Sequence, residues 1–288
     1  IVNNKNFKHK ILDQNEILDN QLFKEKKIIQ IYKDKYSYIL INCINNNNSS
    51  DFENIGSKLF EFLSSNKFEN AFFNLSLLKI TNSQVERILH GATLKSYSFE
   101  IYKTRKKIKK SINIHIVGKS TKSILKTKLD ALTEGVFLTR DLVSEPGNIL
   151  HPDEYAKRIA KLSKLGIKVT VYDEKKLKKM GCGALLGVGQ GSIRGSYLVT
   201  MEWKGASSKT KPLAFVGKGV CFDTGGISLK PAKFMEDMTY DMAGSAVVVG
   251  LMKSLALRKA KINAVGVVGL VENMPGGNAQ RPGDIVKS

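Results

Sequence analysis

Residues 216–231 read Val216-Gly217-Lys218-Gly219-Val220-Cys221-Phe222-Asp223-Thr224-Gly225-Gly226-Ile227-Ser228-Leu229-Lys230-Pro231. An apolar run at residues 213–216 leads into this stretch and is predicted to end in a glycine-rich bend. Lys218, Asp223 and Lys230 emerge from the bend, and Asp241 follows soon after. In open α/β sheets, sites form in the loops at the carboxyl ends of strands. We therefore interpret this turn, with two ammonium groups and two carboxylates around it, as a place where charge is handled.

The residue types alone nominate Asp223 and Asp241 as metal ligands. Carboxylate oxygens suit hard or borderline divalent ions, and two adjacent carboxylates can hold a pair of them. They do not nominate Lys218, because an ammonium group has no lone pair until it loses its proton. In the alternative interpretation Asp223 is a turn residue, Asp241 is a helix N-cap, and the lysines pair with them. The residues alone leave both interpretations open.

Strand and helix patterns alternate along the chain and predict an α/β protein. Residues 1–118 are predicted to form a smaller N-terminal α/β domain, and residues 119–145 a helix that links two domains. Residues 146–288 are predicted to form a second α/β domain with a mostly parallel sheet flanked by helices.

Individual elements follow from the periodicity of apolar residues. Strands are predicted at residues 27–32, 36–44, 71–77, 112–117, 168–172, 197–203, 213–216 and 262–271. Helices are predicted at residues 83–94, 121–143, 154–165, 174–180 and 242–257, with a further helix N-capped by Asp51. Residues 187–192 resemble a phosphate loop, but no lysine follows them, and we predict a plain turn.

Composition limits the classes of function. The 46 Lys and Arg residues against 26 Asp and Glu give a net charge of +20, which makes nucleic acid a candidate partner. Because lysine dominates, without interleaved aromatic side chains, we favour a solvated lysine surface instead. No apolar run approaches the ~20 residues that cross a bilayer, so we expect no membrane contact. Three distant cysteines, Cys43, Cys182 and Cys221, predict no disulfide framework and fit a reducing cytoplasm.

No HExxH, histidine cluster or GxSxG occurs, which weakens any interpretation as a zincin or a triad hydrolase. Residues 216–231 are followed by Met235-Glu236-Asp237-Met238-Thr239-Tyr240-Asp241-Met242-Ala243-Gly244. Together these stretches resemble the signature region of the cytosol (leucyl) aminopeptidase family. Residues 139–146, 188–192 and 272–286 are also typical of it. The resemblance is specific from about residue 133 to the end and weak before that.

The resemblance implies a role for each matching residue. By position, Lys218 would bind the second metal through a neutral amine, Asp223 would bridge both metals, and Asp241 would be another ligand of the second metal. Lys230 would polarise the substrate carbonyl and its oxyanion without binding metal. Met238 would line the pocket for the substrate's N-terminal side chain.

The implied protein is a metal-dependent leucyl aminopeptidase, a hydrolase that releases N-terminal, preferably large apolar, residues from peptides. The implied cofactors are two divalent ions, Zn²⁺ or Mn²⁺ with Mg²⁺ as an alternative, and bicarbonate as a further candidate. The resemblance also implies a cytoplasmic homo-hexamer, with residues 146–288 as the N-terminal part of its catalytic domain.

The chain departs from the family at its end. Members carry a block, Asn-Thr-Asp-Ala-Glu-Gly-Arg, shortly after the stretch that matches residues 281–286, and this chain stops at Ser288. We expect the 288 residues alone to be an inactive part of a longer enzyme. The alternatives are a DNA-binding or regulatory protein and a non-catalytic structural paralogue. The second is disfavoured because the metal and lysine positions before the end are intact.

Overall fold

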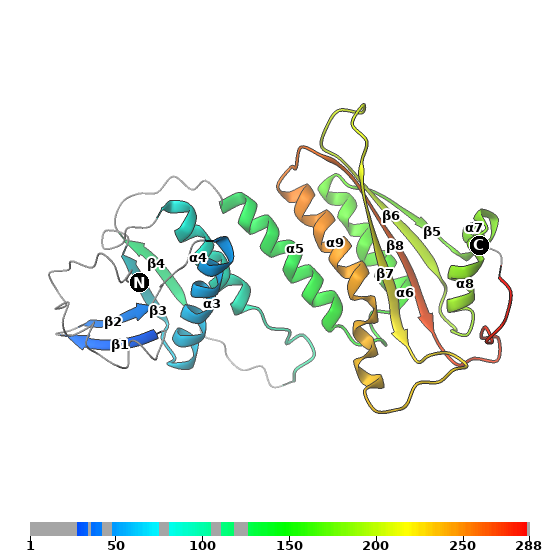
Figure 1. The fold of residues 1–288 in the computed structure, drawn as a ribbon, viewed down its shortest axis with the longest axis horizontal. Coiled ribbons are helices and arrows are strands. Elements are labelled where there is room, and N and C mark those ends of the chain that lie inside the picture. The colour runs from blue at the N-terminus through cyan, green and yellow to red at the C-terminus, as the bar shows by residue number, and fades with distance from the viewer. Residues whose placement is uncertain are drawn as a thin grey trace. The chain divides into compact units, whose positions relative to one another are not determined.

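The computed structural model describes residues 28–33, 36–41, 48–74, 81–104, 111–117 and 126–286 (Figure 1). Contacts divide the chain into two compact units, Ile1–Asp130 and Ala131–Ser288. The division falls inside helix α5 (Lys126–Ser144), the segment for which the sequence predicts a linker. Each unit is described by itself.

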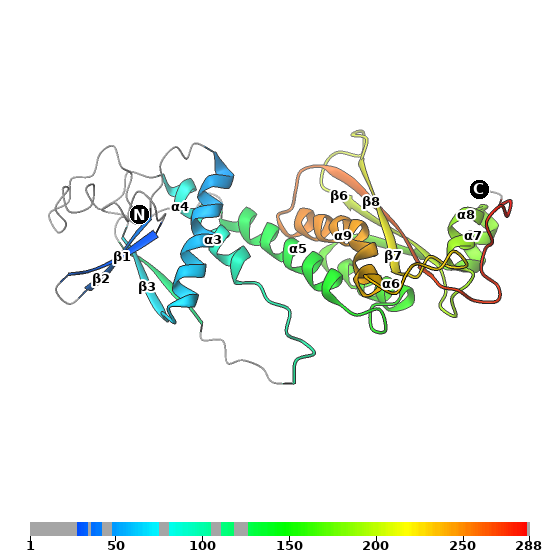
Figure 2. The same cartoon turned by 60° about the horizontal axis from the view of Figure 1, so that its bottom comes forward.

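The described residues of the first unit include two packed helices and two small two-stranded sheets (Figure 2). Strands β1 (Ile28–Lys33) and β2 (Tyr36–Ile41) pair antiparallel, and β3 (Asn70–Asn74) and β4 (Asn113–Val117) pair parallel. Helices α3 (Ser49–Ser65) and α4 (Asn82–Ser96) pack closely, because a Cβ added to Gly56 would lie 1.7 Å from the Ile88 carbonyl oxygen. Fully buried Leu63 and Ile88 belong to the core of this unit.

The N-cap of α3 differs from the prediction. Asn48, not Asp51, caps the helix: its side-chain oxygen accepts a hydrogen bond from the Asp51 backbone N–H at 3.0 Å. The Asp51 carboxylate accepts in return from the Asn48 backbone N–H at 3.4 Å. This reciprocal capping box needs an acidic or amide residue three positions after the cap, which is the position Asp51 holds.

The second unit is built on a four-stranded sheet in the order β5-β6-β8-β7. Its strands are β5 (Lys168–Tyr172), β6 (Tyr197–Lys204), β7 (Leu213–Asp223) and β8 (Asn263–Asn273). β6 runs antiparallel to both neighbours, whereas β7 and β8 are parallel. Three of the four strands therefore run in one direction, and the predicted α/β class is confirmed. The sequence predicts a mostly parallel sheet, but of its three strand pairings one is parallel and two are antiparallel.

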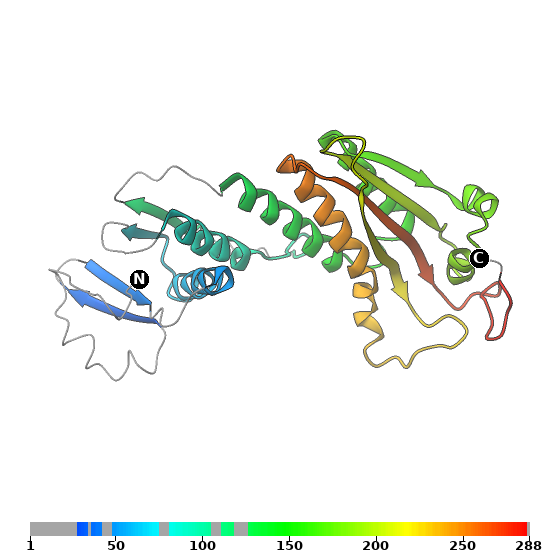
Figure 3. The ribbon, with the colours of Figure 1, turned by 45° about the horizontal axis from the view of Figure 1, so that its top comes forward.

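Helices cover both faces of this sheet (Figure 3). They are α6 (Pro152–Ala160), α7 (Glu174–Met180), α8 (Gly183–Gly189) and α9 (Ala243–Leu257), with 3-10 turns η2 (Lys161–Leu165) and η3 (Met235–Met242). Gly266 of β8 faces Val248 and Met252 of α9, whereas Gly269, an odd number of residues away, faces Leu185 of α8. Because side chains alternate along a strand, α9 and α8 lie on opposite faces. α6 joins α9 in one buried core.

Close approaches between backbones fix the position of α9. A Cβ on Gly135 of α5 would lie 2.4 Å from the Gly250 carbonyl oxygen, and one on Gly217 of β7 would lie 2.6 Å from the Cα of Ser245. η3 and α9 together, Met235–Leu257, form the one described helical stretch long and apolar enough to cross a membrane. Since 56% of its most apolar window is buried against the rest of the unit, we interpret it as a core helix.

Two predictions near the site are wrong. β7 continues through Gly217 and Gly219 to Asp223 instead of bending after Val216, so the chain turns only at Gly225 and Gly226. Residues 187–189 belong to the end of α8, so a turn begins only after them. Cys43 lies outside the described residues, and Cys182 and Cys221 are free.

Candidate functional site

A bulge in β7 determines the face of the sheet on which the Asp223 side chain lies. Val220 lies opposite Val271 and Asp223 opposite Asn273, so three steps along β7 match two steps along β8. Successive side chains of a strand alternate between faces, and one extra residue shifts that alternation. The bulge therefore returns Asp223 to the face on which Lys218 lies.

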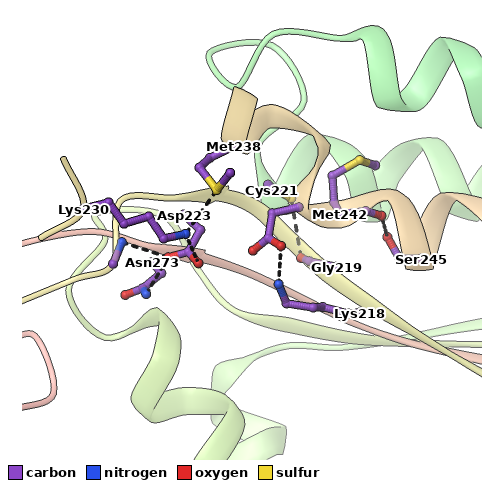
Figure 4. A network of polar contacts seen from close by, with 11 residues as sticks. Lys218, Gly219, Cys221, Asp223, Lys230, Met238, Met242, Ser245 and Asn273 are labelled. Atoms are coloured by element: carbon purple, nitrogen blue, oxygen red, sulfur yellow. Dashed lines mark hydrogen bonds and ion pairs between the residues drawn. The ribbon is translucent and has the colours of Figure 1, made fainter. Parts of the chain in front are cut away.

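Three donors surround the Asp223 carboxylate (Figure 4). Its Oδ1 accepts hydrogen bonds from the Gly225 backbone N–H at 2.9 Å and from Asn273 Nδ2 at 2.7 Å. Its Oδ2 accepts from Lys230 Nζ at 2.7 Å. Partial burial alone would raise the pKa of Asp223, but the bonds from Lys230, Gly225 and Asn273 together lower that pKa below its ordinary value.

The second carboxylate, Asp241, is less well satisfied. Asp241 Oδ1 pairs with Lys218 Nζ, and the Lys218 side chain is 59% exposed while that of Asp241 is 19% exposed. Asp241 Oδ2 is buried and has no hydrogen-bond partner within the described part of the chain. Such an unpartnered buried acceptor costs about 1–3 kcal/mol, more when it is charged. A group that approached this oxygen from outside the chain would remove the penalty.

η3 supplies the remaining predicted residue and packs along β7. Met238 lies in η3 one turn before Asp241, and Lys230 Nζ lies 3.1 Å from its sulfur. The structure thus brings the five predicted residues together from three segments: β7, the loop after it, and η3. Figure 4 shows Lys218, Asp223, Lys230 and Met238 from close by.

The structure bears on both interpretations that the sequence left open. Asp241 is not a helix N-cap, because Met242 holds the cap position of α9 and makes no side-chain cap bond. The turn bond from Gly225 to Asp223 and both lysine–carboxylate pairs, however, are present as the alternative expects. Both carboxylates are therefore held by cations while one of them keeps a bare oxygen.

The residues present fit part of a divalent-metal site. Two aspartates offer hard oxygen ligands, and the buried Asp241 Oδ2 has no hydrogen-bond partner among the described residues. No group of three or more His, Cys, Asp or Glu side chains able to hold a metal occurs among the residues that the structure describes. A metal held here would have two carboxylates as candidate ligands, with Lys218 as a third once its amine is neutral.

A buried hydroxyl pair supports the segment that carries Asp241, and sequence reasoning missed it. Ser245 Oγ donates to the Met242 carbonyl oxygen at 2.7 Å, and Tyr155 O–H lies 3.0 Å from that Oγ and donates to it. Burial raises the pKa of Tyr155, so the hydroxyl stays protonated. Gly219 leaves space for this pair, because its Cβ would lie 3.2 Å from Ser245 Oγ.

Two further stretches quoted for the family resemblance lie against each other. Ser192 Oγ donates to Glu272 Oε2 at 2.6 Å. Gly191 lies so close to the loop after β8 that a Cβ on it would be 2.1 Å from the Met274 carbonyl oxygen. The loop after α8 and the loop after β8 therefore form one packed layer next to the end of β8.

Comparison with known proteins gives consistent matches. The model of the cytosol aminopeptidase family, catalytic domain, matches residues 137–288. The probable cytosol aminopeptidase of Brucella suis biovar 1 (strain 1330) is 52% identical over 247 residues, which cover 83% of this chain and 50% of that protein. The probable cytosol aminopeptidase of Afipia carboxidovorans is 55% identical over 214 residues, 71% of this chain and 42% of that protein. The chain spans about half the length of the curated relatives it matches.

A solved structure shares the fold. The bottromycin maturation enzyme BotP in complex with Mn matches with a TM-score of 0.77 at 24% identity, over 90% of this chain and 56% of that chain. At that identity the likeness concerns the fold alone.

Proposed function

This chain belongs to the cytosol aminopeptidase family, and on that premise we propose that it carries metal-binding and catalytic residues of a metal-dependent aminopeptidase. One observation supports this most strongly. Lys218 and Asp223 of β7 pair with Asp241 and Lys230, and a buried Asp241 oxygen has no partner among the residues that the structure describes. The sheet edge where parallel strands end is also where α/β folds place their sites.

We propose that Asp223 and Asp241 hold divalent metal, with Lys218 as an amine ligand. Bound there, the ions would supply Lewis-acid activation of water and of the substrate carbonyl. Oxygen ligands with one amine fit Zn²⁺ or Mn²⁺, with Mg²⁺ as an alternative. BotP, of similar fold, was solved in complex with Mn, which supports Mn²⁺ as the first ion to try.

We propose that Lys230 acts on the substrate. Its ammonium group now donates to Asp223, yet its side chain is 36% exposed, so Nζ has room to turn outward. A fixed positive charge at the carbonyl oxygen would stabilise the oxyanion that forms during hydrolysis. Met238 lies against the same Nζ and offers an apolar thioether wall, which supports a preference for large apolar N-terminal side chains.

The remaining proposals concern the whole protein. Peptides are the proposed substrates, and relatives named cytosol aminopeptidases support a cytoplasmic location. The homo-hexamer and the bicarbonate rest on the family resemblance alone.

The test is hydrolysis of leucine amide by the polypeptide that contains this chain, after metal removal and readdition of Mn²⁺ or Zn²⁺. We expect activity only with metal, and its loss in Asp241→Asn. Glu202→Gln is the matched control, because Glu202 is also ion-paired, with Lys168, but lies where β5 pairs with β6. Activity without metal, or an unchanged Asp241→Asn variant, would contradict the proposal.

A further inference from the structure

We propose that Asn273 is a positioning residue that fixes the Asp223 carboxylate in the orientation in which it binds metal. The metal-binding part of this inference rests on the proposed function. Asn273 is the last residue of β8, and after the bulge it lies directly opposite Asp223. The sequence gives no sign that these two residues are in contact, since fifty positions separate them along the chain.

The side-chain contact is direct and has a defined direction. Asn273 Nδ2 lies 2.7 Å from Asp223 Oδ1, which is the length of a charge-assisted hydrogen bond. An ionised carboxylate can only accept, so the amide nitrogen must face it and the amide oxygen must point away. The amide oxygen therefore lies on the side of Gly226.

Gly226 makes room for that amide. The residue has φ +66°, and a Cβ there would lie 2.7 Å from Asn273 Oδ1, closer than real contacts allow. Glycine meets both demands, because it adopts positive φ without penalty and has no Cβ. The loop is thus shaped around the Asn273 side chain.

The backbone of Asn273 anchors the same loop a second time. Its carbonyl oxygen accepts from the Thr224 backbone N–H at 3.0 Å and from Thr224 Oγ1 at 2.9 Å. The Thr224 carbonyl oxygen in turn accepts from the Lys230 backbone N–H at 2.9 Å. One residue at the end of β8 therefore orders both Asp223 and the backbone that carries Lys230.

The consequence for metal binding follows from how the two Asp223 oxygens differ. Oδ1 has two donors that belong to the framework, the Gly225 N–H and the Asn273 amide. Oδ2 has a single donor, at the tip of the flexible Lys230 side chain. Groups that orient a metal ligand in this way typically contribute 10–100-fold to metal affinity. Removing the amide would let the carboxylate rotate and would weaken binding by a factor in that range.

A purely structural role for Asn273 is the competing explanation, and β8 itself offers the control. Asn263 starts the same strand, is buried, and donates through Nδ2 to the carbonyl oxygens of Ser207 at 2.7 Å and Thr210 at 2.9 Å. It lies at the opposite end of the strand from Asp223. Asn263→Ala therefore removes a side-chain anchor of equal type without reaching the carboxylate.

The experiment compares Asn273→Ala and Asn263→Ala in the polypeptide that contains this chain, by calorimetric titration of the metal-free protein with Mn²⁺ and by thermal unfolding. We expect Asn273→Ala to weaken Mn²⁺ binding roughly 10–100-fold and Asn263→Ala to leave it within about twofold. Equal Mn²⁺ affinities in Asn273→Ala and wild type, or equal losses in both variants, would overturn the proposal. If Asn273→Ala does not fold, Gly226→Ala, which drives a methyl group into the amide oxygen, must weaken binding in the same way.

A crystal structure of metal-free Asn273→Ala separates this inference from the proposed function. A rotated Asp223 carboxylate would support the positioning role, and an unchanged one would overturn it, whether or not metal binds. If the wild-type protein takes up no Mn²⁺, the proposed function fails and the crystal structure still decides the role of Asn273.

Discussion

The two carboxylates of the site are held in opposite ways. Asp223 has three donors, two of them from the framework, and its pKa lies below the ordinary value. Among the described residues, Asp241 has one partner, Lys218, and a buried oxygen with none. The first carboxylate is therefore fixed in its orientation, whereas the second has a buried oxygen without a hydrogen-bond partner. On the proposed function both are metal ligands. Four predictions test that difference.

The largest effect is expected at the unsatisfied carboxylate. Asp241→Asn removes the charge that the proposed metal would neutralise, and we expect the loss of measurable metal-dependent leucine-amide hydrolysis. The metal-free variant should fold, since an amide at this position carries no charge to bury. Titration with Mn²⁺ and a peptidase assay measure the two quantities. A variant that keeps wild-type Mn²⁺ affinity would show that the bare oxygen has no connection with metal.

The second-largest effect is expected for Lys230, which donates to Asp223. Lys230→Met should lower kcat by roughly 10²–10³-fold, the cost of losing one oxyanion donor. Metal affinity should hold or rise, because Asp223 Oδ2 loses the ammonium group that competes with a metal. A parallel loss of metal affinity and kcat would instead make Lys230 part of the metal site.

Met238→Ala is expected to change substrate binding and not the chemical step. Removing the thioether wall should raise KM for leucyl substrates about tenfold relative to alanyl substrates, with a small change in kcat. Comparison of the two substrates in one assay gives the ratio. An equal effect on both substrates would show that Met238 does not determine the side-chain preference.

The smallest effect concerns the pH dependence of stability. Because the folded pKa of Asp223 lies below the unfolded value of about 3.9, its contribution to stability is complete above about pH 4. That contribution is lost as the pH falls through the folded pKa. Urea unfolding of the metal-free protein should therefore show a shallower acid decline of the unfolding free energy for Asp223→Asn than for wild type. Parallel curves would mean that the three donors do not stabilise the charged carboxylate.

Periodicity and composition were sufficient for much of the second unit. The bounds predicted for α7 and β5 agree with the structure. β5 alternates apolar and polar residues, and α7 lies between its caps Asp173 and Gly181. The glycines of β7 misled the prediction: they were interpreted as a bend, although they serve close packing against α9. Glycine in a strand can mark a close backbone approach, and only the partner helix reveals which case applies.

The candidate residues could be named from the sequence, but their geometry could not. The bulge that aims Asp223 depends on the register between β7 and β8, which no local pattern encodes. The same register brings Asn273 to Asp223. The Ser245–Tyr155 hydroxyl pair joins segments ninety positions apart, and neither residue carries a chemical signal of its own.

The central claim is that Asp223 and Asp241 together bind divalent metal. The most direct measurement is a crystal structure of the polypeptide containing this chain, soaked with Mn²⁺ and recorded with anomalous data. Metal binding by both carboxylates predicts anomalous density against Asp241 Oδ2 and Asp223 Oδ2, with Lys230 Nζ turned away from Asp223. Anomalous density elsewhere, with both lysine–carboxylate pairs intact, would contradict it.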